Sequence, residues 1–218
     1  MRARAGAKRP VTWDKLSMAV SILQTPAAVD QPLPRKRFTR SEVARMAEIG
    51  LFDGQRFELI DGDLIDKMGQ KPPHANAIRR CMRQLLQIFG ADSVLIQLPI
   101  EAGAADREWN QPEPDLAVLS DAEGEFSQRH PNGSELALAI EIADTSLYQD
   151  MARKRELYAR AGVPEYWVLD LNGRRLIVHR ALNPQTAQYD RVLGYAEHET
   201  IAVACRPSPE ILVSALLP

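Results

Sequence analysis

The feature that most constrains this chain is a pair of acidic residues beside two apolar runs. Glu141 directly follows the run 136–140, and Asp115 directly precedes the run 116–119. Short, nearly continuous apolar runs are typical of strands that are covered on both faces of a sheet. A carboxylate in such a strand loses much of its hydration, so it needs a cation, a proton or hydrogen bonds in compensation. The two acids therefore indicate a binding site on a buried sheet.

A hard divalent metal ion is the ligand that this site is expected to hold. Mg²⁺ and Mn²⁺ prefer oxygen ligands, and Mg²⁺ keeps several waters. Asp115 and Glu141 offer two carboxylates, the backbone carbonyl of Ile142 offers a third oxygen, and Glu58 offers a further carboxylate. The sequence therefore predicts Asp115, Glu141, Ile142 and Glu58 as metal ligands, with Mg²⁺ or Mn²⁺ as the cofactor.

Lys154 adds a cation thirteen positions after Glu141. Hydrolysis of a phosphodiester needs an activated water and neutralisation of the negative charge that develops on the phosphate. A lysine can orient or deprotonate the water, or stabilise the pentavalent phosphorus. Glu58, Asp115, Glu141 and Lys154 therefore form the predicted catalytic set of a nuclease.

The helix that carries Lys154 is expected to have Asp150 as its N-cap and to end at Gly162. Asp150, Lys154 and Tyr158 then fall at positions i, i+4 and i+8, on one stripe of the helix that can reach the two acid-bearing strands. Arg153 is expected to point elsewhere, to solvent or phosphate, as is its neighbour at position 155.

Each candidate also has a purely structural explanation. Glu141 can pair with an arginine, and Lys154 can be one more solvated cation. His74, at the start of a predicted helix, can contact a phosphate or shuttle a proton, but it can also cap that helix. The order of these residues along the predicted sheet favours a site.

Periodicity and turn residues predict the remaining elements. They are a helix over 39–48 ended by Gly50, a hairpin over 56–65 around Asp61-Gly62, a helix over 74–89, a strand over 93–100, a hairpin over 165–181 with a type I′ signature at Asn172-Gly173, strands near 189–192 and 200–204, and an apolar turn over 211–217. This order predicts an α/β (α+β) fold with a mixed central sheet.

Length and composition favour one domain, over residues 39–218, preceded by an extended or partly helical arm over 1–38. The net charge of −2 does not favour nucleic-acid binding, but basic residues are grouped. One group, Arg79, Arg80 and Arg83, can form a local basic face or merely a solvated helix face.

The sequence contains no motif that indicates another enzyme chemistry, export or membrane insertion. No phosphate-binding glycine loop, serine-nucleophile elbow or zinc-ligand spacing is present. Cys81 and Cys205 match no disulfide pattern. Residues 11–30 are too polar for a signal-peptide core and too short for a membrane span. We therefore predict a soluble, cytoplasmic protein that has no contact with a membrane.

Several segments together resemble a known family. They are Phe57–Leu64, His74, Glu113–Val118, Ile140–Ile142 and, most distinctively, Lys154–Asp170. They are similar to the Uma-two restriction endonuclease family, a branch of the PD-(D/E)xK nuclease superfamily, over about residues 39–217. The resemblance implies a restriction endonuclease-like mixed central β-sheet flanked by helices, with magnesium-dependent cleavage of DNA.

The resemblance also implies roles for single residues. Pro114-Asp115 matches the first acid of the superfamily and Glu141 the second. The superfamily lysine normally lies two residues beyond the second acid, where this chain has Ala143. Uma-two-like sequences place the lysine on the following helix, which points to Lys154. The segment 143–146 differs from the Ser-Pro-Ser-Thr that is common in the family.

Three functional hypotheses follow. The leading one is a divalent-metal-dependent endodeoxyribonuclease that acts on DNA as a homodimer, because cutting both strands needs two active sites. Candidate dimer contacts are the apolar segments 211–213 and 216–217 and the hairpin at Tyr166-Trp167, although both could equally be part of the core. The second is a catalytically silent nucleic-acid-binding or assembly module with the nuclease fold. The third, a structure-specific or RNA-directed nuclease, uses the same residues.

Overall fold

The computed structural model describes residues 35–67, 71–122, 124 and 126–218. Lys36–Pro218 form one compact unit. Nearly all of the arm predicted for residues 1–38 lies outside the described residues. Within the described part of the chain, no helix is both long enough and apolar enough to cross a membrane.

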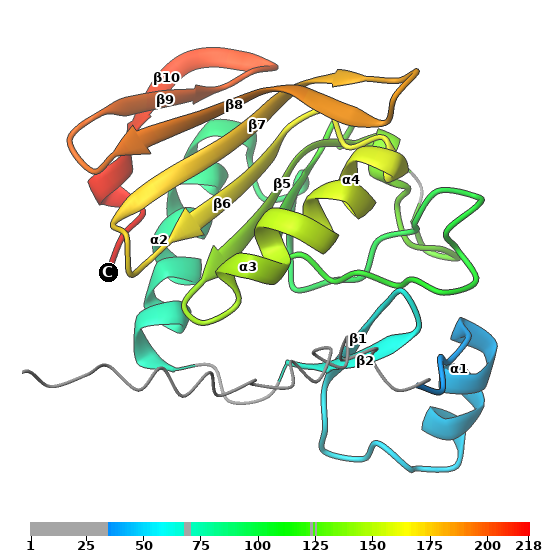
Figure 1. Cartoon of the computed structure of the whole chain (residues 1–218). Coiled ribbons are helices and arrows are strands. Elements are labelled where there is room, and N and C mark those ends of the chain that lie inside the picture. Colours follow the sequence, from blue (N-terminus) through cyan, green and yellow to red (C-terminus); the bar gives the residue numbers. More distant parts are fainter. Residues whose placement is uncertain (1–34, 68–70, 123, 125) are drawn as a thin grey trace, which may run out of the picture. The chain divides into compact units, whose positions relative to one another are not determined.

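A six-stranded mixed sheet forms the centre of this unit (Figure 1). Its strands are, in spatial order, β3 (Val94–Ile96), β4 (Leu116–Leu119), β5 (Leu136–Ala143), β6 (Tyr166–Asp170), β7 (Arg175–Asn183) and β8 (Gln188–Ala196). Neighbouring strands are antiparallel except for β5 and β6, which are parallel. The mixed α/β fold predicted from the sequence is confirmed.

One strand is shorter than its sequence predicts. The strand expected over 93–100 contributes only β3 to the sheet. Gln97 has a φ of 50°, outside the range of a strand, so the chain bends away after Ile96. The backbone N–H of Gln97 still donates to the carbonyl of Asp115 at 3.1 Å, which ties this bend to the start of β4.

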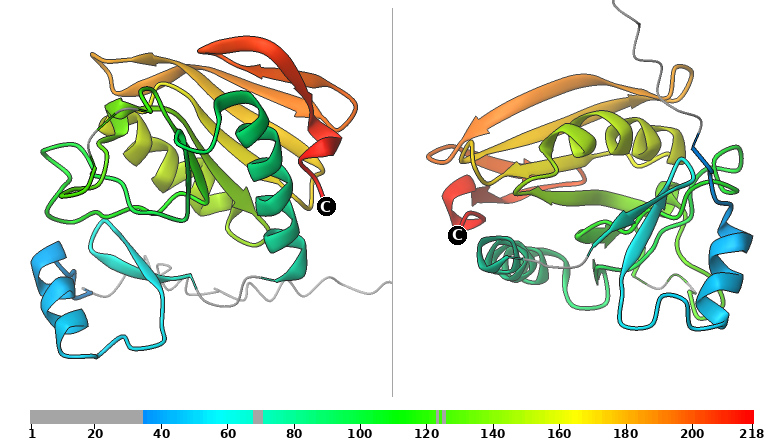
Figure 2. Two further views of the ribbon diagram at one scale, coloured as in Figure 1. Left: turned by 180° about the vertical axis from the view of Figure 1, so that it is seen from behind. Right: turned by 60° about the horizontal axis from the view of Figure 1, so that its bottom comes forward.

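Helices cover both faces of the sheet (Figures 1 and 2). The helical elements are α1 (Arg40–Glu48), α2 (Pro72–Phe89), α3 (Leu147–Gln149), a π-helical turn (Asp150–Lys154) and α4 (Arg155–Ala161). α2 packs on one face, and the continuous segment from α3 to α4 packs on the other. This second segment joins β5 to β6, because two parallel neighbouring strands need a crossover connection.

The alternation of side chains between the two faces of β5 determines which way Glu141 points. Residues 138, 140 and 142 belong to the core on the α2 side, whereas Ala139 and Ala143 belong to the core on the α4 side. Since successive side chains point to opposite faces of a sheet, Glu141 points between the two alanines towards α4. The small alanine side chains let the helix lie close to the sheet, so Glu141 is only 2% exposed.

Two smaller sheets complete the unit. They pair β1 (Phe57–Ile60) with β2 (Asp63–Asp66), and β9 (Thr200–Val203) with β10 (Arg206–Leu212). The first hairpin is closed by Asp61 and Gly62, whose φ values of 50° and 80° suit a two-residue type I′ turn. Its register pairs Glu58 with Ile65, which puts both on the same face.

The turn between β6 and β7 corrects the prediction of a type I′ turn at Asn172-Gly173. Neither of these residues has a positive φ, and Arg174 adopts the left-handed conformation instead, with a φ of 46°. The carboxylate of Asp170 accepts a hydrogen bond from the N–H of Gly173 at 2.8 Å. This bond fixes a longer turn over residues 171–174 in place of the two-residue turn.

Most of the candidate dimer contacts are part of the core, which is the alternative that the sequence left open. Ile211, Leu216 and Leu217 are buried and pack on the α2 side of the sheet, and so does Trp167. Tyr166 is buried in the core on the other face. Leu212, in contrast, is 43% exposed. The buried side chains are therefore not available as a dimer surface.

His179 on β7 is a buried, neutral histidine. Its ring stacks on that of Tyr166 and lies against that of Tyr189. Its Nδ1 lies 3.2 Å from the carbonyl oxygen of Tyr166, while Nε2 is buried without a hydrogen-bond partner among the described residues. Burial lowers the pKa of His179 from the ordinary value of 6.5 to about 4.

Acidification should therefore destabilise the fold through His179. The unfolded chain takes up this proton near pH 6.5 and the folded chain only near pH 4, so stability is lost as the pH falls through that window. A shift of this size corresponds to roughly 2–3 kcal/mol. Urea unfolding at pH 7 and pH 4.5 should show a smaller loss of stability in His179→Phe than in the wild type. Equal losses in both proteins would contradict the assignment.

Candidate active site

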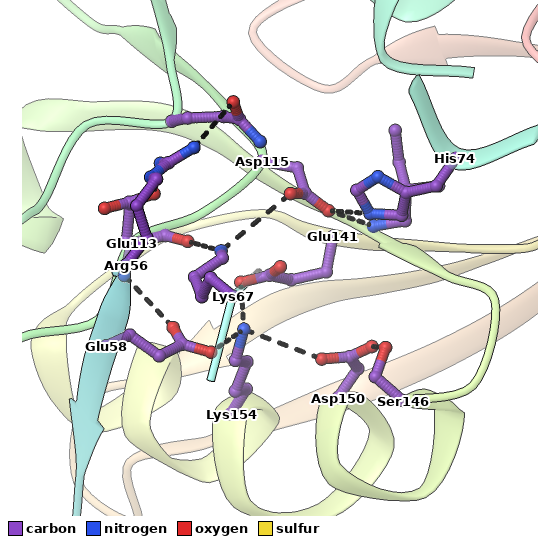
Figure 3. A network of polar contacts seen from close by, with 12 residues as sticks. Arg56, Glu58, Lys67, His74, Glu113, Asp115, Glu141, Ser146, Asp150 and Lys154 are labelled. Carbon is purple, nitrogen blue, oxygen red and sulfur yellow. Dashed lines mark hydrogen bonds and ion pairs between the residues drawn. The ribbon is translucent and has the colours of Figure 1, made fainter. Parts of the chain in front are cut away.

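A pocket of about 170 Å³ lies where β5 meets the hairpin β1–β2 and the first turns of α2 and α3. It is lined by charged side chains from all of these elements, among them Glu58, Lys67, His74, Asp115, Glu141 and Lys154. Figure 3 shows that these side chains converge from segments far apart in the sequence.

Lys154 connects three carboxylates (Figure 3). Its Nζ lies 2.7 Å from Glu58 Oε1 and 2.9 Å from Glu141 Oε1, and 3.8 Å from Asp150 Oδ1. All four side chains are buried. Burial opposes a charge on Lys154, but the carboxylates of Glu141, Glu58 and Asp150 outweigh it and hold the pKa of Lys154 well above its usual value. Lys154 is therefore a protonated cation in this arrangement.

The helix that carries Lys154 differs from its predicted form. It begins at Leu147, so the prediction of Asp150 as N-cap is wrong. Asp150 lies within the π-helical turn, where its carboxylate accepts a hydrogen bond from Ser146 Oγ at 2.5 Å and faces Lys154. A side-chain cation and a hydroxyl, rather than the N–H groups of a helix end, compensate this carboxylate. π-helical turns occur frequently at functional sites.

One carboxylate oxygen of Asp115 is hydrogen-bonded, and the other accepts no hydrogen bond from the described residues. Oδ2 accepts a hydrogen bond from the N–H of Ile142 at 2.9 Å and lies 3.1 Å from His74 Nε2. Oδ1 is buried and has no hydrogen-bond partner among the described residues, although Lys67 Nζ lies 3.8 Å away. An unsatisfied buried carboxylate oxygen that faces a pocket is suited to bind a cation.

The two predicted acids have opposite protonation tendencies. Burial raises the pKa of Glu141 to about 8, although the charge of Lys154 acts against this rise. Burial also acts to raise the pKa of Asp115, but the hydrogen bond from His74, the charge of Lys67 and the N–H of Ile142 outweigh it, and the pKa lies below its usual value. Asp115 is thus the ionised carboxylate at neutral pH, and Glu141 the one that retains a proton most readily.

Glu58 and Tyr158 hold Glu141 and Lys154 in place. Glu58 Oε1 accepts from Lys154, and Oε2 accepts from the N–H of Glu113 at 3.2 Å, so both oxygens are engaged within the protein. Tyr158 donates its hydroxyl to Glu141 Oε1 at 2.6 Å and is fully buried. Glu58 therefore supports Lys154 in this arrangement, and its role as a metal ligand stays a prediction.

Arg153 corrects another expectation. It does not point to solvent or phosphate, because it donates to Asp63 Oδ2 at 3.0 Å and to the carbonyl of Ile60 at 2.9 Å. It thereby fastens the hairpin β1–β2 to the π-helical turn. Arg155, in contrast, is partly exposed and forms an ion pair with its neighbour Glu156, with 3.2 Å between Nη2 and Oε1.

Lys67 is a site residue that the sequence analysis missed. It directly follows β2, its Nζ donates to the carbonyl of Glu113 at 2.6 Å, and only 10% of its side chain is exposed. The hairpin register offered a signal. Because Glu58 pairs with Ile65, Lys67 lies two positions further on the same face, beside Glu58.

The residues present fit a divalent cation that keeps part of its hydration shell. No group of three or more histidine, cysteine, aspartate or glutamate side chains in the described residues forms a ready metal site. Asp115 Oδ1 is nevertheless unsatisfied, and Glu141 and Ile142 line the same pocket. Two carboxylates and a carbonyl, completed by waters and phosphate oxygens, suit Mg²⁺ better than a metal that needs a complete protein cage.

Comparison with known proteins decides the family. The model of the family "Uma2: Putative restriction endonuclease" matches residues 41–207. The chain belongs to this family. The match contains every predicted site residue, and it confirms the resemblance that the sequence segments indicated.

A solved structure supports the fold of this Uma2 protein. The fold is similar to that of a protein from Anabaena variabilis ATCC 29413 described as a "putative nuclease belonging to DUF820". The TM-score is 0.62 at 16% sequence identity, and the similarity covers 82% of this chain and 97% of the other. At this identity the likeness concerns the fold alone. Among curated proteins, none matches the chain.

Proposed function

We propose that this Uma2 protein is a divalent-metal-dependent endodeoxyribonuclease that hydrolyses phosphodiester bonds in DNA. The observation that carries the proposal is the convergence of Asp115, Glu141 and Lys154 in one pocket, with Asp115 Oδ1 left without a hydrogen bond. Family membership supports a nuclease, and the pocket chemistry supports a metal-assisted reaction.

Asp115 and Glu141 would hold the metal ion, together with the carbonyl of Ile142. The N–H of Ile142 already faces Asp115, and the carbonyl of a strand residue lies on the same side of the strand as its N–H. A bound Mg²⁺ or Mn²⁺ would lower the pKa of a coordinated water and neutralise phosphate charge. The ionised Asp115 supplies the permanent negative charge of the site.

Lys154 acts in this proposal as a cation rather than as a base. Its three carboxylate neighbours keep it protonated, so it can stabilise the negative charge that develops on the phosphate but cannot accept a proton from water. Glu58 and Asp150 position its ammonium group, and Tyr158 positions Glu141.

His74 and Lys67 flank the other side of the pocket. His74 holds Asp115 through Nε2, and its Nδ1 is buried without a partner among the described residues. Lys67 places a second positive charge beside Asp115. Both residues can contact a phosphate oxygen of the bound strand, and the ammonium group of Lys67 balances part of the negative charge of the site before a metal ion enters.

A catalytically silent nucleic-acid-binding or assembly module is the second hypothesis, and the chain's low net charge favours it. Four buried carboxylates without a catalytic use are costly to maintain, which favours the nuclease. A two-fold homodimer remains part of the proposal for double-strand cleavage, now without the surfaces first assigned to it.

The decisive experiment incubates the purified protein with supercoiled plasmid in the presence of Mg²⁺, Mn²⁺ or chelator. We expect nicked or linear product with either metal and none with chelator. Linear product that appears together with a dimer in light scattering would support two cooperating active sites, whereas nicking by a monomer would remove the dimer from the proposal. Cleavage of RNA but not of DNA, or of neither, would overturn the proposed substrate or activity.

A further inference from the structure

The composition of α2 departs from that of the rest of the chain. Its 18 residues include Arg79, Arg80 and Arg83 but no aspartate or glutamate. The whole chain, in contrast, contains 29 acidic and 27 basic residues. α2 is therefore a strongly basic element in a protein with a small negative net charge.

The arginines lie on the side of α2 that faces away from the sheet. The buried residues of the helix are Ala77, Ile78, Cys81, Leu85 and Ile88. With 3.6 residues per turn, positions 79 and 83 fall on the opposite side, and both arginines are exposed. Arg80 borders them and is half-buried. We call these three residues the arginine face.

No carboxylate among the described residues neutralises the arginine face. Among the described residues, none of its three arginines forms an ion pair with a carboxylate. Arg79 donates to Asn76 Oδ1 at 2.7 Å, and Arg80 Nε is buried without an acceptor. Some exposed arginines elsewhere do have carboxylate partners, as in the pair Arg129–Glu135, whereas Arg45 and Arg191 have none among the described residues.

This arrangement does not serve the stability of the helix. Arg79 and Arg83 stand at positions i and i+4, where like charges destabilise a helix. Basic residues also interact favourably with the C-terminal end of a helix, yet the last turn of α2 has none. A purely solvated face would be expected to mix both signs of charge, so the unpaired arginines call for an external anion.

We propose that the arginine face binds phosphates of a DNA duplex whose scissile bond lies in the pocket. The proposal rests on the proposed function and assigns a second contact surface to the same substrate. The first turn of α2 reaches the pocket through His74, and Arg83 lies nine residues further along. Nine residues of helix span about 14 Å, the length of about four base pairs.

Nucleic acid fits this surface better than a protein partner does. Asn76 and Gln87 lie on the same side of the helix as the arginines, and amide side chains are common donors to phosphate oxygens. None of the large exposed hydrophobic residues of the described chain lies on α2, whereas the centre of a protein interface is apolar. The arginine face therefore offers charge and hydrogen bonds without an apolar anchor.

The test measures binding of a fluorescent 20-base-pair DNA duplex by anisotropy in chelator, so that cleavage cannot interfere. The variant Arg79→Gln/Arg83→Gln should bind roughly tenfold more weakly at about 0.1 M salt, and its slope of log affinity against log salt should be shallower by about 2. The matched control, Arg45→Gln/Arg191→Gln, removes two exposed arginines of α1 and β8 that have no ion pair among the described residues. It should bind like the wild type, and melting temperatures should be unchanged in both variants.

Each other outcome decides against part of the proposal. Equal affinity in the wild type and the α2 variant, or an equal loss in the control, would overturn the arginine face even if the plasmid is cleaved. If the α2 variant lost affinity for duplex RNA but not for duplex DNA, the choice of DNA as the partner would be overturned. If the wild type cleaved no nucleic acid but the α2 variant still lost affinity for DNA, the arginine face would stand as a DNA-binding surface and the proposed nuclease activity would be refuted. Absence of DNA binding by the wild type at low salt would refute both.

Discussion

Lys154→Met should lower plasmid cleavage by a factor of about 10² to 10³ or more, because it deletes a charge that acts on the transition state. The same change leaves Glu58, Glu141 and Asp150 buried without their shared cation. Breaking a buried ion pair from one side costs about 3–5 kcal/mol. The metal-free variant should therefore melt roughly 6–20 °C below the wild type, and cleavage assays should be run well below that temperature.

A second substitution separates catalysis from folding. Glu58→Gln in the Lys154→Met background removes one of the uncompensated buried charges, so it should restore part of the melting temperature but none of the cleavage. Magnesium binding, measured by calorimetry, should persist in both variants because Asp115 and Glu141 are retained. Recovery of cleavage together with stability would show that Lys154 only supports the fold, and the catalytic cation would have to be sought elsewhere.

Asp115→Asn should abolish both the binding of magnesium and the cleavage that depends on it. A ligand bound only by the folded state stabilises it by mass action, which amounts to about 1.4 kcal/mol at a concentration of ten times Kd. This corresponds to a rise in the wild-type melting temperature of roughly 3–6 °C. The rise should be absent in Asp115→Asn, whose amide can still accept from the N–H of Ile142 but no longer offers a second negative oxygen.

Lys67 provides the complementary variant. Its ammonium group lies 3.8 Å from Asp115 Oδ1, where it repels an incoming metal ion. Lys67→Met should therefore tighten magnesium binding, whereas Lys36→Met, a change of an exposed lysine on the N-terminal side of α1, should leave it unchanged. Equal magnesium affinity in Asp115→Asn and the wild type would move the metal site away from Asp115.

Asp115→Asn should also change the stability of the metal-free protein. Two adjacent carboxylates alone would repel each other, so removal of one charge would stabilise the protein. His74, Lys67 and the N–H of Ile142 instead favour the ionised form and lower the pKa of Asp115. The metal-free variant should therefore be slightly less stable than the wild type at neutral pH.

Local patterns in the sequence determined the elements on which the site is built. The apolar runs at 116–119 and 136–140 became β4 and most of β5, because strands covered on both faces are apolar at nearly every position. Asp61-Gly62 became a type I′ turn, since both residues tolerate a positive φ. Thr39 capped α1 through a capping box with Glu42. In each case the deciding interaction lies within a few residues of the pattern.

Tertiary structure alone decided how the charged groups share their partners. The apolar runs indicate that Glu141 is buried, but only the packing of α4 on β5 places Lys154 and Tyr158 on the same oxygen. The contact of Lys154 with Glu58 likewise joins segments that lie about a hundred residues apart in the sequence, and no local pattern encodes it.

Lys67 and the C-terminal segment show the same division. The hairpin register put Lys67 on the face of Glu58, yet its place beside Asp115 depends on how the hairpin packs against β4. The apolar residues of β10 could cover this chain or a second copy, because hydrophobic burial has no direction. The fold of the chain buries Ile211 in its own core, whereas Leu212 is 43% exposed. The sequence thus determined which residues are buried and charged, and the tertiary structure decided which of them meet.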